Sequence, residues 1–389
     1  MTKELLYIHI ASVQDSKSGG LNTTLLQVFS MCTAFVKAGY KVTLAMQKNK
    51  GFEYNAKEFI NNTFRDGIDF EIITWNEKSK NNFFNKILVK RSIVQIAKQN
   101  NPDMIFCRDS YILNALTKID VPIIYESHNS RLHTGKNILH NFLEKRLLRA
   151  VHSPNFKCLF SISEALSKHW EQKGVPKDKL FAWHDGFDAS LFEKHIDKNN
   201  AKSKLNFPIN KTIVTYTGGL YLNRDIENII YLAREFPDLM FLVIGGPEKH
   251  LQYFKKISQE EAVFNINFMG FVEHNLIPNF LYASDILLAL WSSKVPTINY
   301  CSPLKIFEYM AACRTIVAHD FPTIREVLVN EKDSILCEPD NFDSLKLALS
   351  KALIEKNTSK YGEVAREKAF KLYSWDNRVS ELLKFVQNQ

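Results

Sequence analysis

The sequence predicts two α/β domains, each built on a doubly wound parallel sheet. The first observation is length, because 389 residues exceed what one hydrophobic core usually organises. The second is the pattern, in which short apolar runs of strand type alternate with helical segments. The third is a polar stretch rich in lysine and asparagine in the middle of the chain, which is typical of a linker. We expect domains at residues 1–190 and 211–373, joined by a linker at 191–210.

The composition is that of a globular protein, with 45% hydrophobic and 12% aromatic residues. No apolar run approaches the roughly 20 residues that cross a bilayer, and the N-terminus does not resemble a signal peptide. The six cysteines are scattered without a Cys-x-x-Cys pair, which argues against a zinc site and for a reducing, cytoplasmic compartment. The net charge of +8 is moderate. Nucleic acid is disfavoured as a partner, because the basic segments lack a recognised aromatic interleaving.

In the first domain, the pattern begins with an apolar strand at 5–11, a polar loop that ends at Gly20, and a helix from about residue 21 to 37. A glycine pair at such a turn is typical of a βαβ unit, and a simple tight turn is the alternative explanation. His128 directly follows an expected strand, and the carboxyl ends of strands are where such sheets bind ligands. It is a candidate site residue, with a histidine bonded to backbone as the alternative. The further strands are expected at residues 41–45, 70–74, 104–107, 123–126 and 158–161.

In the second domain, a helix is expected after the apolar strand at 285–290, with Ser302 as its N-cap and Pro303 as its first helical residue. The free N–H groups and the positive dipole end of such a helix suit a phosphate group. Glu308 shares the apolar face of this helix and needs a partner, either sugar hydroxyls or a nearby Lys or Arg. The other strands of this domain are expected at residues 212–217, 240–244, 266–270 and 315–318.

Residues 300–312, Tyr-Cys-Ser-Pro-Leu-Lys-Ile-Phe-Glu-Tyr-Met-Ala-Ala, resemble the donor-binding motif of GT-B retaining glycosyltransferases of family 4, the group 1 glycosyltransferases. The similarity is greatest to the branch that carries Tyr before a Ser-Pro-Leu-Lys run. The resemblance implies the GT-B fold, in which two Rossmann-like domains face a central cleft. The first domain would bind the acceptor and the second the nucleotide-sugar donor. A C-terminal helix, at about 374–389, would pack back on the first domain.

The resemblance also implies roles for individual residues. In the family, the helix start binds the donor diphosphate through backbone N–H groups, and the glutamate matching Glu308 holds the ribose hydroxyls. A Glu-x-His motif, matched by residues 126–128, brings a histidine near the transferred sugar. The glycine pair ending at Gly20 lets backbone approach donor and acceptor, and the loop after Gly270 meets the nucleobase. The donor-binding residues implied are Gly20, Gly219, Arg224, Phe271, Val272, Tyr300, Ser302, Pro303, Leu304, Lys305 and Glu308.

Several positions depart from the family pattern. Gly219 stands where the family usually has Arg, and Arg224 stands where it has Lys. Arg224 keeps a charge that can grip phosphate oxygens, and Lys305 can supply the cation that position 219 lacks. Tyr300 replaces the first of two glutamates that many relatives carry. Cys313 replaces a common glycine, so the turn at the helix end must differ or be strained.

Glycosyl transfer requires that the leaving diphosphate be stabilised, the sugar oriented and the acceptor hydroxyl aligned. The sequence contains no Asp-x-Asp motif that would hold a metal for this purpose. We therefore expect a metal-independent enzyme with no cofactor beside its nucleotide-sugar substrate. His128, Arg224 and Lys305 are the expected catalytic residues. Retention of the anomeric configuration, by front-face transfer assisted by the leaving phosphate, is what the family implies.

The expected activity is that of a hexosyltransferase-type glycosyltransferase (EC 2.4) that moves a sugar from a UDP- or GDP-sugar to a glycan or lipid-linked sugar, in bacterial surface polysaccharide synthesis. Two alternatives stay open, a GT-B nucleotide-sugar epimerase and a degenerate transferase that only binds sugar nucleotide or scaffolds a partner. The basic segments 81–100 and 131–149 favour an anionic membrane surface, as in a peripheral protein on the inner face of the plasma membrane, or a lipid diphosphate. Solvated helix faces explain these segments equally.

Overall fold

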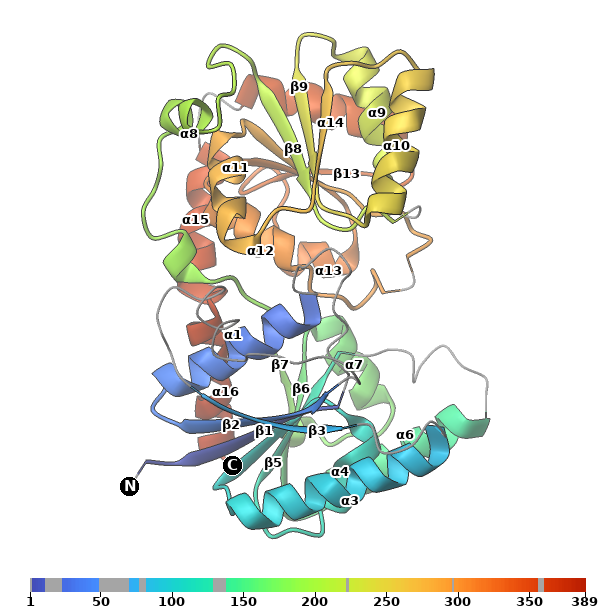
Figure 1. Ribbon diagram of the computed structural model, residues 1–389, viewed down its shortest axis with the longest axis vertical. Coiled ribbons are helices and arrows are strands. Elements are labelled where there is room, and N and C mark those ends of the chain that lie inside the picture. The colour runs from blue at the N-terminus through green and yellow to red at the C-terminus, as the bar shows by residue number, and fades with distance from the viewer. Residues whose placement is uncertain are drawn as a thin grey trace. The chain divides into compact units, whose positions relative to one another are not determined.

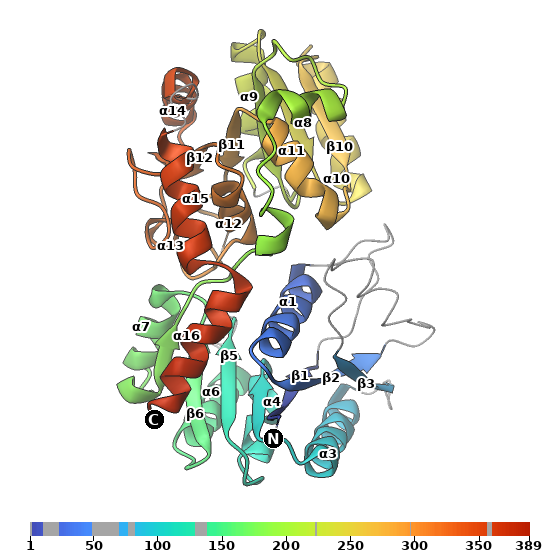
Figure 2. The ribbon, with the colours of Figure 1, turned by 90° about the vertical axis from the view of Figure 1, so that its left-hand side faces the viewer.

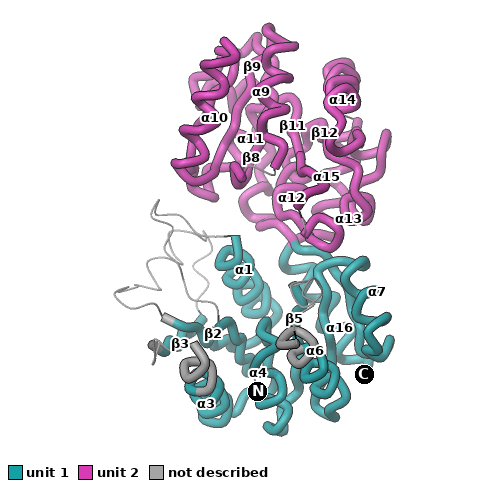
Figure 3. The backbone as a smooth tube through the Cα atoms, turned by 90° about the vertical axis from the view of Figure 1, so that its right-hand side faces the viewer, with its two compact units in different colours: residues 1–185, 375–389 teal, residues 186–374 magenta. Residues whose placement is uncertain are grey.

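The computed structural model describes residues 2–10, 23–48, 70–76, 82–128, 138–221, 224–295, 297–355 and 360–389. The chain forms two compact units (Figure 3). The first unit comprises residues 1–185 and 375–389, and the second comprises residues 186–374. Each unit is a parallel sheet with helices on both faces (Figures 1 and 2). The predicted class, a pair of doubly wound α/β domains, is confirmed.

The first unit contains a sheet in the order β3-β2-β1-β4-β5-β6-β7, in which every adjacent pair runs parallel. Strands β1, β4 and β5 are buried almost throughout, as expected of strands covered by helices on both faces. The strand order reverses between β1 and β4, which is where doubly wound sheets bind ligands. The strands are β1 (Glu4–His9), β2 (Lys41–Lys48), β3 (Glu71–Asn76), β4 (Met104–Cys107), β5 (Ile123–Ser127), β6 (Phe156–Ser161) and β7 (Leu180–Ala182).

Helices cover both faces of this sheet. Helices α1 and α16 lie side by side on one face, while α3, α4 and α6 lie on the other (Figures 1 and 2). Right-handed crossovers require this division, because the strand order runs outward from β1 in two directions. The helices are α1 (Thr23–Lys37), α3 (Asn82–Asn100), α4 (Ser110–Leu116), α6 (Ile138–Val151), α7 (Glu164–Gln172), the 3-10 turn η1 (Lys177–Lys179) and α16 (Trp375–Gln387).

The second unit contains a sheet in the order β10-β9-β8-β11-β12-β13, again parallel throughout. The order reverses between β8 and β11, so the loops that follow these two strands border the expected ligand position. Apolar side chains from the sheet pack into a core on each face of it. The strands are β8 (Ile213–Thr217), β9 (Met240–Ile244), β10 (Ile266–Gly270), β11 (Ile286–Ala289), β12 (Thr315–His319) and β13 (Ile335–Cys337).

The helices of the second unit surround this sheet (Figure 1). They are η2 (Ala189–Leu191), α8 (Lys198–Lys204), α9 (Ile226–Glu235), α10 (Glu248–Glu260), η3 (His274–Leu276), α11 (Ile277–Ala283), α12 (Leu304–Ala311), α13 (Pro322–Arg325), α14 (Phe342–Glu355) and α15 (Lys360–Leu372). Within the described ranges of either unit, no helix has the length and apolarity that crossing a bilayer would need.

The segment expected as a linker, 191–210, differs from that expectation. It contains α8 and belongs to the second unit. Its lysines are not all solvated, because Lys198 Nζ lies 2.6 Å and Lys202 Nζ 3.0 Å from the two carboxylate oxygens of Asp285. The lysine-rich composition therefore suggested a linker, whereas the segment forms a helix that is joined by ion pairs to the start of β11. The chain passes from one unit to the other at residues 185–186 and 374–375.

Candidate functional site

The helix at the centre of the predicted site, α12, begins one residue later than expected. Its first helical residue is Leu304, and Pro303 is the N-cap with an extended backbone at ψ 115°. The prediction of Ser302 as N-cap and Pro303 as first helical residue is therefore wrong. The observed reason is the backbone of Pro303, whose extended ψ keeps this residue outside the first helical turn. Ser302 is buried just before this turn.

The hydroxyl of Tyr309 joins α12 to the sheet. It accepts hydrogen bonds from the backbone N–H and the side chain of Thr217, at 2.8 and 3.1 Å, and donates to the carbonyl of Leu288 at 3.3 Å. These residues lie at the carboxyl ends of β8 and β11, which flank the reversal of strand order. The amino end of α12 is thus held at the ligand-binding edge that the topology defines.

Glycines allow the loops after β8 and β9 to lie against each other. Gly218 has φ +134° and Gly245 has φ +109°, conformations that only glycine adopts without strain. A Cβ atom at Gly245 would lie 2.5 Å from the carbonyl oxygen of Gly218, so a side chain there would separate the loops. Gly219, a predicted donor-binding residue, follows directly, and a Cβ there would lie 2.4 Å from the ring of Tyr221.

Lys305, on the first turn of α12, is directed toward this glycine loop. Its Nζ lies 3.8 Å from the ring centre of Tyr216 and 5.0 Å from that of Trp291, and a Cβ at Gly218 would lie 2.9 Å from it. Burial, and then the positive charge of Arg224, lower the pKa of Lys305 well below its usual range. An ammonium group held by aromatic faces in this way is stabilised by an anion placed next to it.

Arg224 lies just before α9, and its charge acts on Lys305 and on Tyr216, so the structure brings the two predicted cations close together. The next residue, Asp225, caps α9 in the left-handed conformation at φ +61°. Its carboxylate accepts from Asn228 Nδ2 at 2.9 Å and lies 3.7 Å from Nε2 of the buried His319. Sequence reasoning missed Asp225 and His319, because the contact between them joins loops that are far apart in the chain.

Glu308 has a partner that was not foreseen. Its Oε1 is 2.6 Å from Nε2 of His274, a residue of the turn η3 that follows β10. Burial opposes a charge on His274, but the hydrogen bond to Glu308 and its negative charge outweigh burial, and the pKa of His274 is raised. The side-chain partner of Glu308 is therefore a histidine and not the Lys or Arg that was the expected alternative. His274 follows Gly270 by four residues, and that proximity to the predicted base loop was the one signal in the sequence.

The remaining predicted donor residues are placed as follows. The Phe271 side chain is exposed, whereas Val272 packs against a core cluster formed by Ile213, Leu242, Ile244 and Phe280. Tyr300 closes a turn through its N–H, which donates to the carbonyl of Thr297 at 3.1 Å. Gly20 lies outside the described residues.

The turn after α12 contains one of the departures from the family pattern, and its backbone is strained. Cys313 has a left-handed φ of +59°, so this turn is strained where a glycine would not be.

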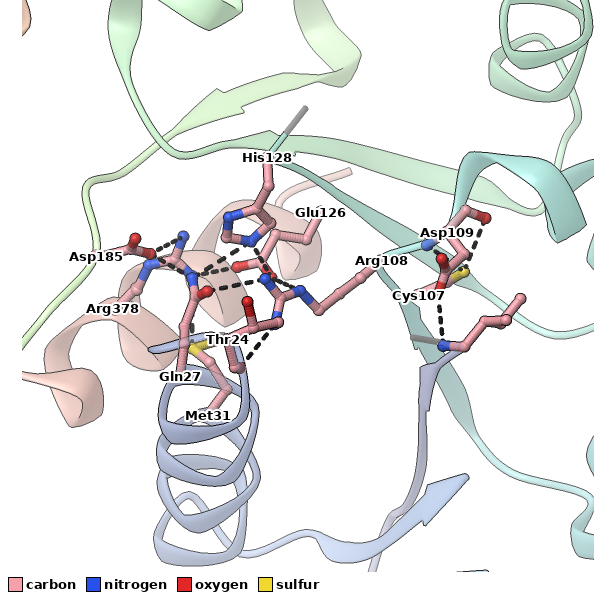
Figure 4. A network of polar contacts seen from close by, with 11 residues as sticks. Thr24, Gln27, Met31, Cys107, Arg108, Asp109, Glu126, His128, Asp185 and Arg378 are labelled. Atoms are coloured by element: carbon pink, nitrogen blue, oxygen red, sulfur yellow. Dashed lines mark hydrogen bonds and ion pairs between the residues drawn. The ribbon is translucent and has the colours of Figure 1, made fainter. Parts of the chain in front are cut away.

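In the first unit, His128 lies at the end of β5 within a buried polar network (Figure 4). Its Nε2 is 2.7 Å from Oε2 of Glu126 and 3.3 Å from the side-chain nitrogen of Gln27. Glu126 is fully buried and also contacts Arg378 Nη1 at 2.6 Å and Arg108 Nε at 3.2 Å. Burial, and then the charge of Arg108, lower the pKa of His128 to about 4. His128 is therefore uncharged at neutral pH. Among the described residues its ring contacts the side chains of Glu126 and Gln27, and it has no partner there in the backbone, the expected alternative.

Sequence reasoning named Glu126 and His128 but missed the two arginines and Asp185, which completes the network. Asp185 Oδ1 accepts from Gln27 at 2.5 Å and lies 3.3 Å from Arg378 Nη2. Arg378 is on α16, and no local pattern relates residue 378 to residue 126. His9, at the end of β1, is also buried, and its Nδ1 has no hydrogen-bond partner among the described residues.

Within the described part of the chain, no group of three or more His, Cys, Asp and Glu side chains is arranged as ligands for a metal ion.

Two family models match this chain. "Glycosyltransferase Family 4" matches residues 19–191, and "Glycosyl transferases group 1" matches residues 197–369. With the two parallel-sheet units, these matches define the class as GT-B glycosyltransferases. The chain belongs to the group 1 and family 4 glycosyltransferases. Its place in the branch with Tyr before Ser-Pro-Leu-Lys stays a prediction.

Curated relatives are distant and match in part. An uncharacterized glycosyltransferase of Methanocaldococcus jannaschii is 22% identical over 53% of this chain. The lipopolysaccharide 1,2-N-acetylglucosaminetransferase of Salmonella typhimurium is 21% identical over 64% of it. The matched regions span 53% of the length of the first relative and 66% of the second.

Solved structures share the fold over the full chain. A sucrose-phosphate synthase from Thermosynechococcus elongatus superposes with a TM-score of 0.77 at 15% identity, covering 99% of this chain and 98% of the other. Anabaena HepE, in complex with UDP-glucose, superposes with a TM-score of 0.73 at 14% identity, covering 98% and 99%. These similarities support the fold.

Proposed function

We propose that this protein is a retaining glycosyltransferase that moves a sugar from a UDP- or GDP-sugar to a glycan or lipid-linked acceptor. The observation that carries the proposal is the convergence of Arg224, Lys305 and the glycine loop at the amino end of α12. The positive charges of these two residues lie close together, and carboxylates offset little of the charge at Lys305. They therefore favour a ligand that carries two negative charges. A nucleoside diphosphate meets that requirement.

The rest of the nucleotide fits the neighbouring residues. Glu308 uses Oε1 for His274 and keeps Oε2 for the ribose hydroxyls. The backbone at Gly270, Phe271 and Val272 continues from the same strand end as His274 and would meet the base. UDP is the preferred nucleotide, because the fold relative HepE was solved with UDP-glucose.

The reaction follows from these contacts. The bond between the anomeric carbon and the diphosphate oxygen breaks, and the acceptor oxygen bonds to the same face of that carbon. The acceptor proton passes to the leaving phosphate, whose charge Arg224, Lys305 and the amino end of α12 stabilise. We name no enzymic nucleophile, because Tyr300 occupies the position where relatives carry a first carboxylate. His128 is assigned to the transferred sugar.

The acceptor is assigned to a surface glycan or lipid-linked sugar, since one relative acts in lipopolysaccharide synthesis. A peripheral association with an anionic membrane is supported by basic residues of the first unit. Burial, then Arg146 and Lys118, lower the pKa of Lys90, so these three cations from neighbouring segments lie near one another. Such a cluster suits lipid phosphates.

A panel of UDP- and GDP-sugars tests the proposal, read as donor hydrolysis and as transfer to a lipid-linked acceptor. We expect one donor to be turned over with retention, assigned by NMR of the product anomer. An inverted product would refute the stereochemistry. Turnover of the donor to an isomer without acceptor would favour an epimerase. Donor binding by calorimetry with neither reaction would favour the degenerate binder, which the departures at Gly219, Tyr300 and Cys313 keep open.

Metal removal tests the proposed independence from cations. Because Arg224 and Lys305 take the place of a metal at the diphosphate, we expect turnover to be unchanged within about twofold by excess EDTA. Loss of activity in EDTA, restored by Mg²⁺ or Mn²⁺, would contradict this part of the proposal.

A further inference from the structure

The network around Glu126 contains more positive charge than the carboxylate alone would need. Arg378 reaches it from α16, with Nη1 2.6 Å from Oε1, and Arg108 reaches it from the end of β4, with Nε 3.2 Å from Oε2. Both arginine side chains are at most 7% exposed. A guanidinium group does not lose its proton in proteins, so these two charges are permanent. Burial opposes a charge on Glu126, but its contacts with His128 and then with Arg378 and Arg108 outweigh burial and lower its pKa.

Arg378 is fixed from several directions, as Figure 4 shows. Its Nε donates to the carbonyl of His184 at 2.9 Å, and its Nη1 also lies 3.4 Å from the sulfur of Met31. The guanidinium stacks over Phe160, with 4.1 Å between its carbon and the ring centre. Because several contacts fix the Arg378 side chain, it in turn fixes the position of the Glu126 carboxylate.

His128 is the part of this network that retains access to solvent, with 20% of its side chain exposed. Oε2 of Glu126 lies 2.7 Å from its Nε2, and a neutral ring can face a carboxylate at this distance only if Nε2 carries the proton. The amide nitrogen of Gln27 lies 3.3 Å from the same ring nitrogen, and this amide is oriented by Arg108 and Asp185. Nε2 is thus directed at Glu126, and among the described residues Nδ1 is left as an acceptor for a ligand.

The charges around His128 decide its state. The groups that face it or its immediate partners are His9 from β1, Arg108 with Asp109 after β4, Glu126 from β5, Asp185 after β7 and Arg378 from α16. Glu126 matches one of the two permanent positive charges, and burial raises the pKa of Asp185 to about 7, so Asp185 offsets the other only in part. A proton on His128 would add a further positive charge to this buried cluster, which is unfavourable.

We propose that Arg378, acting through Glu126, is a positioning residue that keeps His128 uncharged and oriented, so that Nδ1 can exchange a hydrogen bond with a hydroxyl of a bound sugar. This inference rests on the proposed function for the identity of the ligand. The C-terminal helix therefore contributes to the site through Arg378, although α16 follows the whole second unit in sequence.

The experiment follows the His128 ring by NMR in full-length protein labelled with ¹⁵N-histidine, without any donor, and compares it with Arg378→Met. Methionine keeps apolar contact with Phe160 and removes the charge. We expect His128 in the unsubstituted protein to stay neutral from pH 8 to 5. In Arg378→Met its titration midpoint should rise by about one pH unit or more, because a nearby like charge is gone. A protonated His128 at pH 7 in the unsubstituted protein, or an unchanged midpoint in the variant, would overturn the proposal.

Kinetics supply the second readout. In Arg378→Met, kcat/KM for the sugar nucleotide should fall about tenfold for each pH unit below the new midpoint, while calorimetric affinity for UDP stays unchanged, since UDP lacks the sugar that is transferred. Weaker UDP binding together with a flat pH profile would assign Arg378 a merely structural role. If UDP does not bind the unsubstituted protein, the proposed function is wrong, whereas the NMR result for His128 is unaffected.

Arg314→Met is the matched control. Arg314 is a half-buried arginine of the second unit whose guanidinium donates to the carbonyls of Tyr282 and Ser284. It should lower the melting temperature and leave the His128 titration unchanged. If Arg378→Met does not fold, Arg378→Lys retains the charge and should keep the midpoint of His128 low, and a raised midpoint there would contradict the proposal.

Discussion

Among the individual residues, Lys305 has the surroundings that most clearly indicate an anionic ligand. Its ammonium group lies over two aromatic rings and beside Arg224, and its pKa is lowered first by burial. A half-buried cation held against aromatic rings and near a second cation destabilises the free protein and strengthens the attraction of an anion.

We therefore predict opposite effects of Lys305→Met on stability and on binding. Stability without ligand should be equal or higher by about 1 kcal/mol, because a desolvated charge is removed. Affinity for UDP should fall roughly 10- to 100-fold, the range for a lost charged hydrogen bond. Thermal unfolding and calorimetry measure the two effects. Lys346→Met, which removes an exposed lysine paired with Glu235, should leave UDP affinity unchanged.

The pH dependence of binding follows from the same residue. In the free protein Lys305 loses its proton below the usual value of 10.5, so the ammonium form becomes scarce as pH rises through the lowered pKa. UDP affinity should weaken over that window in the unsubstituted protein and not in Lys305→Met. The sign for stability is the reverse, because the unfolded chain binds the proton more tightly there and the free folded protein gains stability with rising pH.

Glu308 allows a test of ribose recognition. With Oε1 held by His274, Oε2 is the oxygen available to the ribose hydroxyls. We expect the unsubstituted protein to bind UDP about tenfold more tightly than 2′-deoxy-UDP, a difference of the size of one hydrogen bond to a charged group. In Glu308→Ala the two ligands should bind equally. A preference for UDP that survives this substitution would show that another residue reads the ribose.

Among the elements, the loops after β8 and β9 form the proposed phosphate site, where their backbones meet without side chains between them. A Cβ at Gly245 would meet the Gly218 carbonyl oxygen at 2.5 Å, in a backbone that already has φ +109°. We predict that Gly245→Ala lowers stability by about 2–3 kcal/mol, from left-handed strain plus the displaced loop, and weakens UDP binding.

The control for this prediction is Gly174→Ala. Gly174 has a similar φ of +93°, and an added Cβ there meets no described atom within 4 Å. It should lower stability by about 1 kcal/mol, from backbone strain alone, and leave UDP affinity unchanged. Equal losses of stability in the two variants, measured by urea unfolding, would show that the contact between the loops is unimportant.

At the level of the whole molecule, the residues assigned to the nucleotide all come from the second unit, whereas the His128 network comes from the first. UDP alone should therefore slow amide hydrogen exchange at residues 218–225 and 304–308 and leave β5 unchanged. At a concentration of 100 times Kd it should stabilise the second unit by about 2.7 kcal/mol. Protection that appeared at β5 and not in the loop after β8 would contradict the assignment of the donor to this unit.

Much of this protein could be predicted from local sequence. Strands β4 and β9 were expected at their observed bounds, because a continuous apolar run of that length between helical segments is typical of a buried strand in an α/β chain. The motif around Lys305 and Glu308 was visible for a similar reason, since a helix start, a cation and a carboxylate occupy one short segment. The start of α12 was missed by one residue, because the conformation of Pro303 depends on how the chain enters the helix.

Other features were decided by contacts between distant parts of the chain. Arg378 and Glu126 are 252 residues apart, and His274 and Glu308 are 34 apart, so no periodicity relates them. Segment 191–210 looked like a linker because lysine is usually solvated, and only the position of Asp285 shows that two of its lysines are paired. Backbone periodicity depends on near neighbours and can be read along the chain, whereas the pairing of buried charges depends on which elements the completed sheets bring together.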